Sequence, residues 1–231
     1  MKKIISLFAL AAFVLVGFTS CDYDSKDDAY VTHYVSFDLN EGDTYLVAKG
    51  STYTDPGYTA TEGTEDVTSR VTVSGDVDAN NMGIYNVTYS AVNKDGFSSS
   101  VTRKVLVYDP EVTTDISGKY SITSTDGSQA LFDRYSVIGN SVTLTQLAPG
   151  LYSISDYWGG LYAQTLNYGA AYSCTGYFAF GKDNSITGIS SSDPWNSKMT
   201  SVTGNYDPTT GKVTMDVRIN YHLVMELAKK K

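Results

Sequence analysis

Aromatic side chains gather between Leu151 and Phe180, and their chemistry stands out in this sequence. Six Tyr and one Trp fall in this stretch, and Asp156-Tyr157-Trp158-Gly159-Gly160 is its most polar and irregular point. The two glycines favour a turn or bulge and allow a ligand to approach the backbone closely. Aromatic faces beside a carboxylate suit sugars, which stack on rings, and they suit peptides equally. The stretch therefore predicts a binding site for a glycan or a peptide.

The same rings also have a structural interpretation, which is packing inside a small sheet or barrel. Tyr152, Tyr172 and Tyr177 occur in strand-like runs, so we expect them in a core. Tyr157 and Trp158 stand beside Gly-Gly, so we expect them to be exposed on a loop, where ligand contacts concentrate. The candidate ligand-binding residues are Asp156, Tyr157, Trp158, Tyr162 and, on a second loop, Trp195.

Motifs of catalysis and cofactor binding do not occur in the sequence. It contains no Gly-x-Ser-x-Gly, no His-Glu-x-x-His, no phosphate-binding Gly loop and no Cys/His cluster. The paired carboxylates of glycoside hydrolases meet only in space, but Glu is scarce here and the acidic residues mostly fall in turns or near the N-terminus. Asp76 to Asn80 imitates the start of a calcium loop, yet Asn81 and Val87 stand where that loop needs Gly and Glu. We therefore predict no catalytic residues, no cofactor and no metal site.

The N-terminus has the order of regions found in a secretory signal. Met1-Lys2-Lys3 is positively charged, Ile4 to Gly17 is almost unbroken apolar sequence, and small residues precede Cys21. The apolar run is shorter than a comfortable bilayer span. Residues 1–20 are thus predicted to be a signal peptide, followed by an acidic stalk over residues 21–33.

Cys174 is predicted to be an unpaired cysteine. The sequence has two cysteines, and Cys21 lies at the predicted cleavage site, so Cys174 has no partner within the mature chain. Aromatic neighbours surround Cys174, which is typical of a small buried apolar side chain. We interpret Cys174 as structural.

The elements that must position the aromatic stretch are strands. Nineteen Tyr with abundant Thr, Val and Gly favour strands, and no window outside the signal has a sustained helical period. Short alternating strands separated by turns predict a β-sandwich over residues 34–109. Pro110 favours a short stiff boundary. Consecutive hairpins without a helix between them predict an antiparallel up-and-down sheet or small barrel over residues 110–231. The predicted class is all-β.

The overall charge excludes one class of partner. The formal net charge is −8 at pH 7. Such an acidic chain repels phosphate backbones, so we expect no nucleic-acid partner.

Several motifs in the first half resemble those of the bacterial immunoglobulin-like domains found in surface proteins. These motifs are Tyr53 to Ala60, Asp66-Val67-Thr68, Val71 to Gly75 and Gly83 to Tyr89. Gly83-x-Tyr85 resembles the corner at which a Tyr hydroxyl fixes the start of a late strand. Val87 stands where antibody domains have a disulfide cysteine, so the resemblance implies the sandwich without that disulfide.

The N- and C-terminal regions resemble lipoproteins of Bacteroides. Thr19-Ser20-Cys21 resembles a lipobox, and Lys26-Asp27-Asp28 is similar to the signal that sends such proteins to the outer leaflet. The resemblance implies a lipid on Cys21 and a place in the outer membrane facing the cell exterior. The Gly-x-Tyr start at Gly118 and the turn Asp207-Pro208-Thr209-Thr210-Gly211 resemble the C-terminal domains of Bacteroides surface lipoproteins. Such proteins accompany TonB-dependent nutrient importers, which implies SusC/SusD-like subunits as partners.

Two functional hypotheses follow from these features. In the first, the protein is a non-catalytic surface lipoprotein that captures glycans or peptides for an importer. In the second, it is a structural accessory subunit of the importer complex with no ligand site of its own.

Overall fold

The structure, a computed structural model, describes residues 31–230. The predicted signal peptide, the lipidation site Cys21 and residues 21–30 of the predicted stalk lie outside the described residues. From Tyr34 onward the chain forms one compact unit. No helix in the described part of the chain has the length and apolar character needed to span a bilayer.

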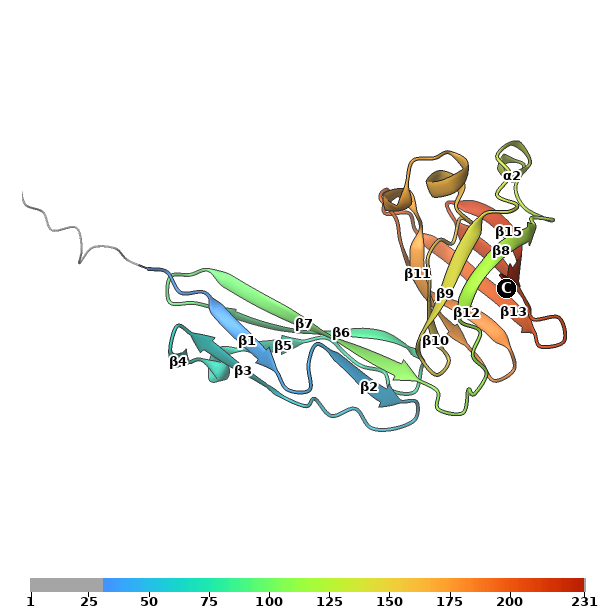
Figure 1. Ribbon diagram of the computed structural model, residues 1–231. Helices are drawn as coiled ribbons and strands as arrows, with labels where there is room; N and C mark the ends of the chain where they lie inside the picture. The colour runs from blue at the N-terminus through green and yellow to red at the C-terminus, as the bar shows by residue number, and fades with distance from the viewer. Residues whose placement is uncertain (1–30, 231) are drawn as a thin grey trace, which may run out of the picture. The chain divides into compact units, whose positions relative to one another are not determined.

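The N-terminal half is a sandwich of two small sheets, as predicted (Figure 1). One sheet has the order β1-β3-β4 and the other the order β2-β7-β6-β5. Strand β2 runs parallel to β7, and the other pairs are antiparallel. The strands are β1 (Val35–Leu39), β2 (Thr44–Ala48), β3 (Tyr58–Glu62), β4 (Glu65–Asp66), β5 (Thr72–Ser74), β6 (Gly83–Val92) and β7 (Ser98–Tyr108), with the short helix η1 (Thr68–Arg70) before β5.

Alternation along β6 builds the sandwich core. Val87, Tyr89 and Ala91 are buried, as their period of two requires for a strand with one face on a core. The predicted tyrosine corner is also present, because the Tyr85 hydroxyl donates a hydrogen bond to the Asn81 carbonyl at 3.0 Å. This bond fixes the start of β6 against the turn that precedes it.

A buried arginine, which the sequence did not reveal, ties the two sheets together. Arg103 on β7 is completely buried. Its Nη1 donates to Asp55 Oδ1 at 2.7 Å and to the Tyr89 hydroxyl at 2.7 Å, and the Tyr89 hydroxyl donates to Asp55 Oδ2 at 2.6 Å. The other guanidinium N–H groups donate to the backbone carbonyls of Asn40, Gly42 and Gly57. All the donors of this buried charge are therefore satisfied.

The C-terminal half is a closed eight-stranded barrel in which every neighbouring pair is antiparallel. The last strand pairs with the first, with Leu227 opposite Ile122, and this pairing resolves the predicted sheet or barrel as a barrel. The strands are β8 (Gly118–Ser124), β9 (Ser141–Ala148), β10 (Leu151–Ile154), β11 (Thr175–Phe180), β12 (Ser185–Ser192), β13 (Met199–Asp207), β14 (Lys212–Ile219) and β15 (Tyr221–Lys229); the short helix α2 (Leu131–Arg134) lies between β8 and β9.

Large side chains fill the barrel interior. The predicted inward set of β14, from Val213 to Ile219 at every second residue, is fully buried. Tyr152 stacks on Phe178 with their ring centroids 5.3 Å apart. Eight strands enclose a space that side chains can fill, so the interior acts as a packed core.

The up-and-down order places four connections at one end of the barrel. Strands β8, β10, β12 and β14 run in the same direction, so the segments that follow them meet at the end opposite to where the chain enters from β7. The longest is the β10–β11 connection, which contains a single π-helical turn η2 (Leu161–Thr165) and the short helix η3 (Ala170–Tyr172). Figure 1 shows it in gold near the upper ends of the barrel strands. The predicted binding stretch thus lies in the largest connection of this end.

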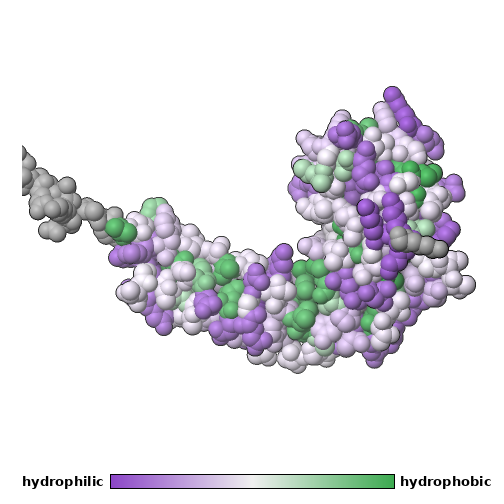
Figure 2. Space-filling model, in the orientation of Figure 1, coloured by the Kyte–Doolittle hydropathy of each residue, from purple (hydrophilic) through white to green (hydrophobic). Residues whose placement is uncertain are grey.

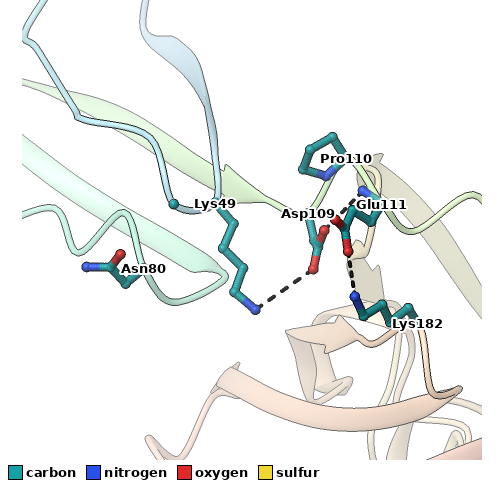
Figure 3. Close-up of a pocket in the computed structure, with 7 residues that line it drawn as sticks. Lys49, Asn80, Asp109, Pro110, Glu111 and Lys182 are labelled. Carbon is teal, nitrogen blue, oxygen red and sulfur yellow. Dashed lines mark hydrogen bonds and ion pairs between the residues drawn. The ribbon is translucent and has the colours of Figure 1, made fainter.

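The segment after β7 makes specific contacts with both halves. The Asp109 amide donates to the Pro149 carbonyl at 3.1 Å, and Lys49 Nζ lies 3.8 Å from Asp109 Oδ2. Lys182 forms an ion pair with Glu111 across the same small pocket (Figure 3). Each cation there already faces a carboxylate, so we interpret this pocket as part of the connection between the halves.

The face of the molecule that Figure 2 shows is mostly polar. Figure 2 shows hydrophobic residues in small groups separated by hydrophilic ones on the visible face. Tyr and Trp have intermediate hydropathy, so exposed rings must be located from their individual exposures rather than from this colouring.

Candidate functional site

Four aromatic rings lie together at the long-loop end of the barrel, three of them exposed and Tyr162 half-buried. We define the aromatic platform as Tyr162, Tyr168, Tyr172 and Trp195. Trp195 is 49% exposed, Tyr168 56% and Tyr172 39%. Neighbouring ring centroids lie 4.6 Å apart for Tyr162 and Trp195, 5.5 Å for Tyr168 and Tyr172, and 5.8 Å for Tyr172 and Trp195. Rings at these separations form a continuous contact surface.

Trp158 lies beneath the platform and supports it from the barrel core. Its ring centroid is 5.5 Å from that of Tyr162 and 5.8 Å from that of Trp195. The indole Nε1–H donates to the Ile219 carbonyl at 2.9 Å, which satisfies the polar atom of a ring that is only 1% exposed. Trp158 thus couples the surface rings to the end of β14.

Local backbone geometry directs Trp158 inward. Gly159 and Gly160 both have positive φ, at 63° and 78°. A Cβ on Gly159 would lie 2.6 Å from the Ile122 side chain, so only glycine fits this turn. The predicted Gly-Gly turn is therefore present, but it sends Trp158 into the core.

The Trp195 loop is held by its own acidic residue. Asp193 Oδ1 accepts a hydrogen bond from the Trp195 amide at 2.8 Å, and its Oδ2 accepts one from the Ser197 amide at 3.0 Å. Side-chain acceptors of this kind stabilise turns after Asp. Asn196 completes the turn with φ of 52°. Trp195 is consequently presented on a fixed turn.

The expectation that Tyr157 and Trp158 are exposed is wrong. Tyr157 is fully buried, and its hydroxyl donates to the Tyr177 carbonyl at 2.8 Å. Gly176 makes room for this ring, because a Cβ there would lie 2.3 Å from it. Both rings extend the barrel core, since the long connection folds back over the open end of the barrel.

Asp156 is also buried rather than presented to a ligand. It is 2% exposed, and its Oδ1 accepts hydrogen bonds from the amides of Trp158 at 2.8 Å and Cys174 at 3.2 Å. Burial raises the pKa of Asp156, with the backbone donors opposing that rise. Asp156 thus joins the two ends of the β10–β11 connection.

The remaining predictions for this stretch have mixed outcomes. Tyr152 is in the core, as predicted, whereas Tyr177 is half-buried and Tyr172 is exposed. Cys174 is fully buried, and burial raises the pKa of its thiol, in agreement with a structural role. Of the five candidate ligand-binding residues, the structure brings together Trp158, Tyr162 and Trp195.

Two rings of the platform, Tyr168 and Tyr172, were not predicted as site residues. Tyr168 sits between Asn167 and Gly169, which both have positive φ, so the chain turns sharply around it. Asn and Gly are both common in turns and loops, and their places on either side of Tyr168 were a signal for an exposed turn there. Tyr221 adjoins the platform and was also missed; its hydroxyl lies 2.7 Å from that of Tyr162. No local signal connects these two residues, which are far apart in the sequence.

The platform offers stacking surfaces and hydroxyls but no metal ligands. Among residues 31–230, no group of three or more His, Cys, Asp or Glu side chains could hold a metal ion. The pKa of Tyr162 is raised to about 12 by burial and by its hydrogen bond with Tyr221, so its hydroxyl is neutral at physiological pH. Neutral hydroxyls and ring faces can bind sugar hydroxyls and C–H groups.

Comparisons with known proteins match both halves of the chain. A family model for a C-terminal domain matches residues 109–229, and the model described as "Bacterial surface protein, Ig-like domain" matches residues 37–107. No curated protein matches the chain.

Two solved structures show different degrees of similarity. The lipoprotein BT2262 from Bacteroides thetaiotaomicron is 30% identical, and the match covers 85% of this chain and 100% of that one, with a TM-score of 0.42. A structure of CBM51-2 in complex with GlcNAc and INT domains from Clostridium perfringens ZmpB is 15% identical, with 79% and 29% covered and a TM-score of 0.28. The second likeness is too weak to show a shared fold.

Proposed function

We propose a function from one premise: the chain belongs to the same family as the lipoprotein BT2262 from Bacteroides thetaiotaomicron. The relative's description as a lipoprotein and the match to a surface Ig-like domain support a location at the cell surface. On this premise, the protein is a non-catalytic surface lipoprotein that binds glycans on its aromatic platform. It serves as an accessory to a TonB-dependent nutrient importer in the outer membrane.

The exposure of closely spaced rings carries this proposal. Trp195, Tyr168 and Tyr172 present large aromatic surfaces to solvent on loops whose turns are fixed. Exposed aromatic clusters on otherwise polar surfaces mark binding sites. Flat ring faces fit the apolar faces of sugar rings, and the hydroxyls of the platform fit sugar hydroxyls.

Binding should depend on the exposed rings rather than on Trp158. We expect Trp195→Ala to weaken oligosaccharide binding by about 1–3 kcal/mol, which is the range of a contact hot spot. Phe97→Ala is a matched control, because Phe97 is 48% exposed and lies in the sandwich. A glycan and peptide array on the full-length protein, followed by calorimetry on the two variants, measures this. Binding of peptides alone, or equal binding by both variants, would contradict the glycan proposal.

The membrane anchor is a separate part of the proposal. Cys21, which lies outside the described residues, carries the lipid. We expect Cys21→Ala to release the protein from the membrane fraction, because the lipid is its attachment. Protease added to intact cells should digest the unaltered protein. Its survival would place the protein on the inner leaflet instead.

The burial of Trp158 favours a second candidate function. Because this ring belongs to the core, part of the aromatic stretch is packing, and in this second function the platform contacts another protein. In that case the protein is a structural accessory subunit of the importer. Trp195→Ala would then reduce co-purification with the importer subunits from cells and leave oligosaccharide binding undetectable in both forms.

A further inference from the structure

A basic pocket adjoins the aromatic platform at the same end of the barrel. Lys198, Arg218 and His222 line it, together with Tyr221 and the neutral residues Thr200 and Asn220. No Asp or Glu lines this pocket, although the chain as a whole has a formal charge of −8. The pocket is thus a local exception to the charge of the protein.

Strand register places Arg218 and His222 side by side. Arg218 on β14 is directly opposite His222 on β15. Asp216, also on β14, has its Oδ1 3.2 Å from Arg218 Nε and 3.2 Å from His222 Nε2. This carboxylate is not among the residues that line the pocket, and the Arg218 side chain is still 49% exposed.

Lys198 supplies a cation that is not neutralised. Among the described residues, Lys198 forms no ion pair, and its side chain is exposed. It reaches the pocket from the segment just before β13, opposite the turn at Asn220. Lys198 and Arg218 against Asp216 leave the pocket with an excess of positive charge.

Tyr221 joins the pocket to the platform. It lines the pocket, while its hydroxyl shares a hydrogen bond with the Tyr162 hydroxyl at 2.7 Å. Its ring centroid is 5.9 Å from that of Trp158. A ligand that stacks on the platform and extends past Tyr221 would therefore bring its next group to Lys198 and Arg218.

We infer that the ligand is an acidic oligosaccharide, whose sugar rings contact the platform and whose carboxylate or sulfate group binds in the basic pocket. Guanidinium and ammonium groups form charge-assisted hydrogen bonds with both kinds of anion. This inference rests on the proposed function, and it specifies in addition that the bound glycan is negatively charged. Uronic-acid and sulfated sugars share the chemistry, and the experiment separates them.

The test compares three oligosaccharides of equal length on the full-length protein: a polyuronate, a sulfated glycan and a neutral glycan. We expect one acidic glycan to bind at least about tenfold more tightly than the neutral one, as a charge-assisted hydrogen bond allows. Added salt should weaken this binding, because it screens exposed charges. Which acidic glycan binds identifies the carboxylate or the sulfate.

Variants separate the pocket from the platform. Lys198→Ala and Arg218→Ala should each lower affinity for the acidic glycan several-fold and leave any neutral-glycan binding unchanged. Lys119→Ala is the control. Lys119 is an exposed lysine on β8 of the same barrel, and it lies beside the C-terminal end of β15, whereas His222 of the pocket lies near the start of β15. A single-stranded oligonucleotide of similar charge should not bind.

The outcomes distinguish the two levels of the proposal. Equal binding of neutral and acidic glycans that is lost in Trp195→Ala would overturn the acidic ligand and keep glycan binding. Equal binding of the oligonucleotide would overturn the acidic-glycan inference, because the pocket would then attract any polyanion. Absence of binding to all three glycans would overturn both the inference and the proposed function.

Discussion

Tyrosines of the sandwich and of the barrel end differ in their burial and in the partners of their hydroxyls and rings. In the sandwich, Tyr89 is fully buried and its hydroxyl lies between Arg103 and Asp55. At the barrel end, Tyr168 and Tyr172 expose their rings to solvent. The same residue type therefore completes a structural network in one region and leaves contact surface free in the other. We expect substitutions in the buried network to lower the stability of the protein, and substitutions among the exposed rings to weaken ligand binding instead.

The largest effect is expected at Trp158, the support of the platform. Trp158→Ala should lower the free energy of unfolding by about 3–5 kcal/mol, as expected for removal of a large buried ring. It also leaves the Ile219 carbonyl without its indole donor. Urea unfolding followed by circular dichroism measures the change. A loss below about 1 kcal/mol would mean that Trp158 is not part of the core.

The next effect is expected at Arg103 in the sandwich. Arg103→Met should lower the free energy of unfolding by about 3 kcal/mol, because it leaves the Asp55 carboxylate without its buried partner. The Asp55 side chain is 30% exposed, so water relieves part of this cost. Arg218→Met is the matched control, since its pair with Asp216 is exposed and should contribute at most about 1 kcal/mol. Equal losses in the two variants would show that the buried network has no special role.

The sequence predicted the strands better than it predicted the environment of individual rings. Alternation along β6 and β14 identified their inward faces, because a strand needs only its own residues to set that period. Trp158 was misplaced because its hydrogen-bond acceptor, Ile219, is 61 positions away. The Gly159-Gly160 turn was predicted, but the presence of a turn does not determine whether the neighbouring Trp158 side chain points into the core or into solvent. Barrel closure was likewise undetermined, because it depends on pairing Ile122 with Leu227.

Buried charge was the other feature that sequence reasoning missed. Arg103 occurs in a regular strand pattern, and its five donors find partners in three separate segments of the chain. Arginine is rarely buried unless such partners exist. Only the packing of the two sheets brings Arg103 and these partners together, so no local sequence pattern predicts the network.

The two regions should also respond to pH in opposite directions. Burial alone would raise the pKa of Asp55, but hydrogen bonds from Tyr89 and Gly57 and the charge of Arg103 hold it below the ordinary 3.8. Its contribution to stability is therefore present above pH 3.8 and is lost as pH falls through the pKa of the folded state. Burial raises the pKa of Asp156, so its contribution is present below 3.8 and is lost as pH rises through its folded-state pKa.

Asparagine variants isolate each contribution. Asp55→Asn should remove part of the stability loss that the protein shows on acidification below pH 3.8. Asp156→Asn retains an oxygen that can accept hydrogen bonds from the amides of Trp158 and Cys174. Because the variant carries no buried charge at neutral pH, its gain in stability over the unaltered protein should be larger at neutral pH than at acidic pH. Urea midpoints measured across the pH range for each variant provide the comparison. The same pH dependence in all three proteins would contradict the assigned pKa directions.

The smallest effect on stability is expected at Trp195, although it belongs to the same ring cluster as Trp158. Half of its surface is already in water, and the turn that holds it depends on Asp193 acceptors and backbone donors rather than on the indole. Trp195→Ala should therefore change the free energy of unfolding by less than about 1 kcal/mol, as is usual for surface substitutions. Urea unfolding beside Trp158→Ala gives the direct comparison. If Trp195→Ala destabilised the protein as much as Trp158→Ala, the exposed rings would be structural too, and the accessory-subunit function would be favoured over glycan binding.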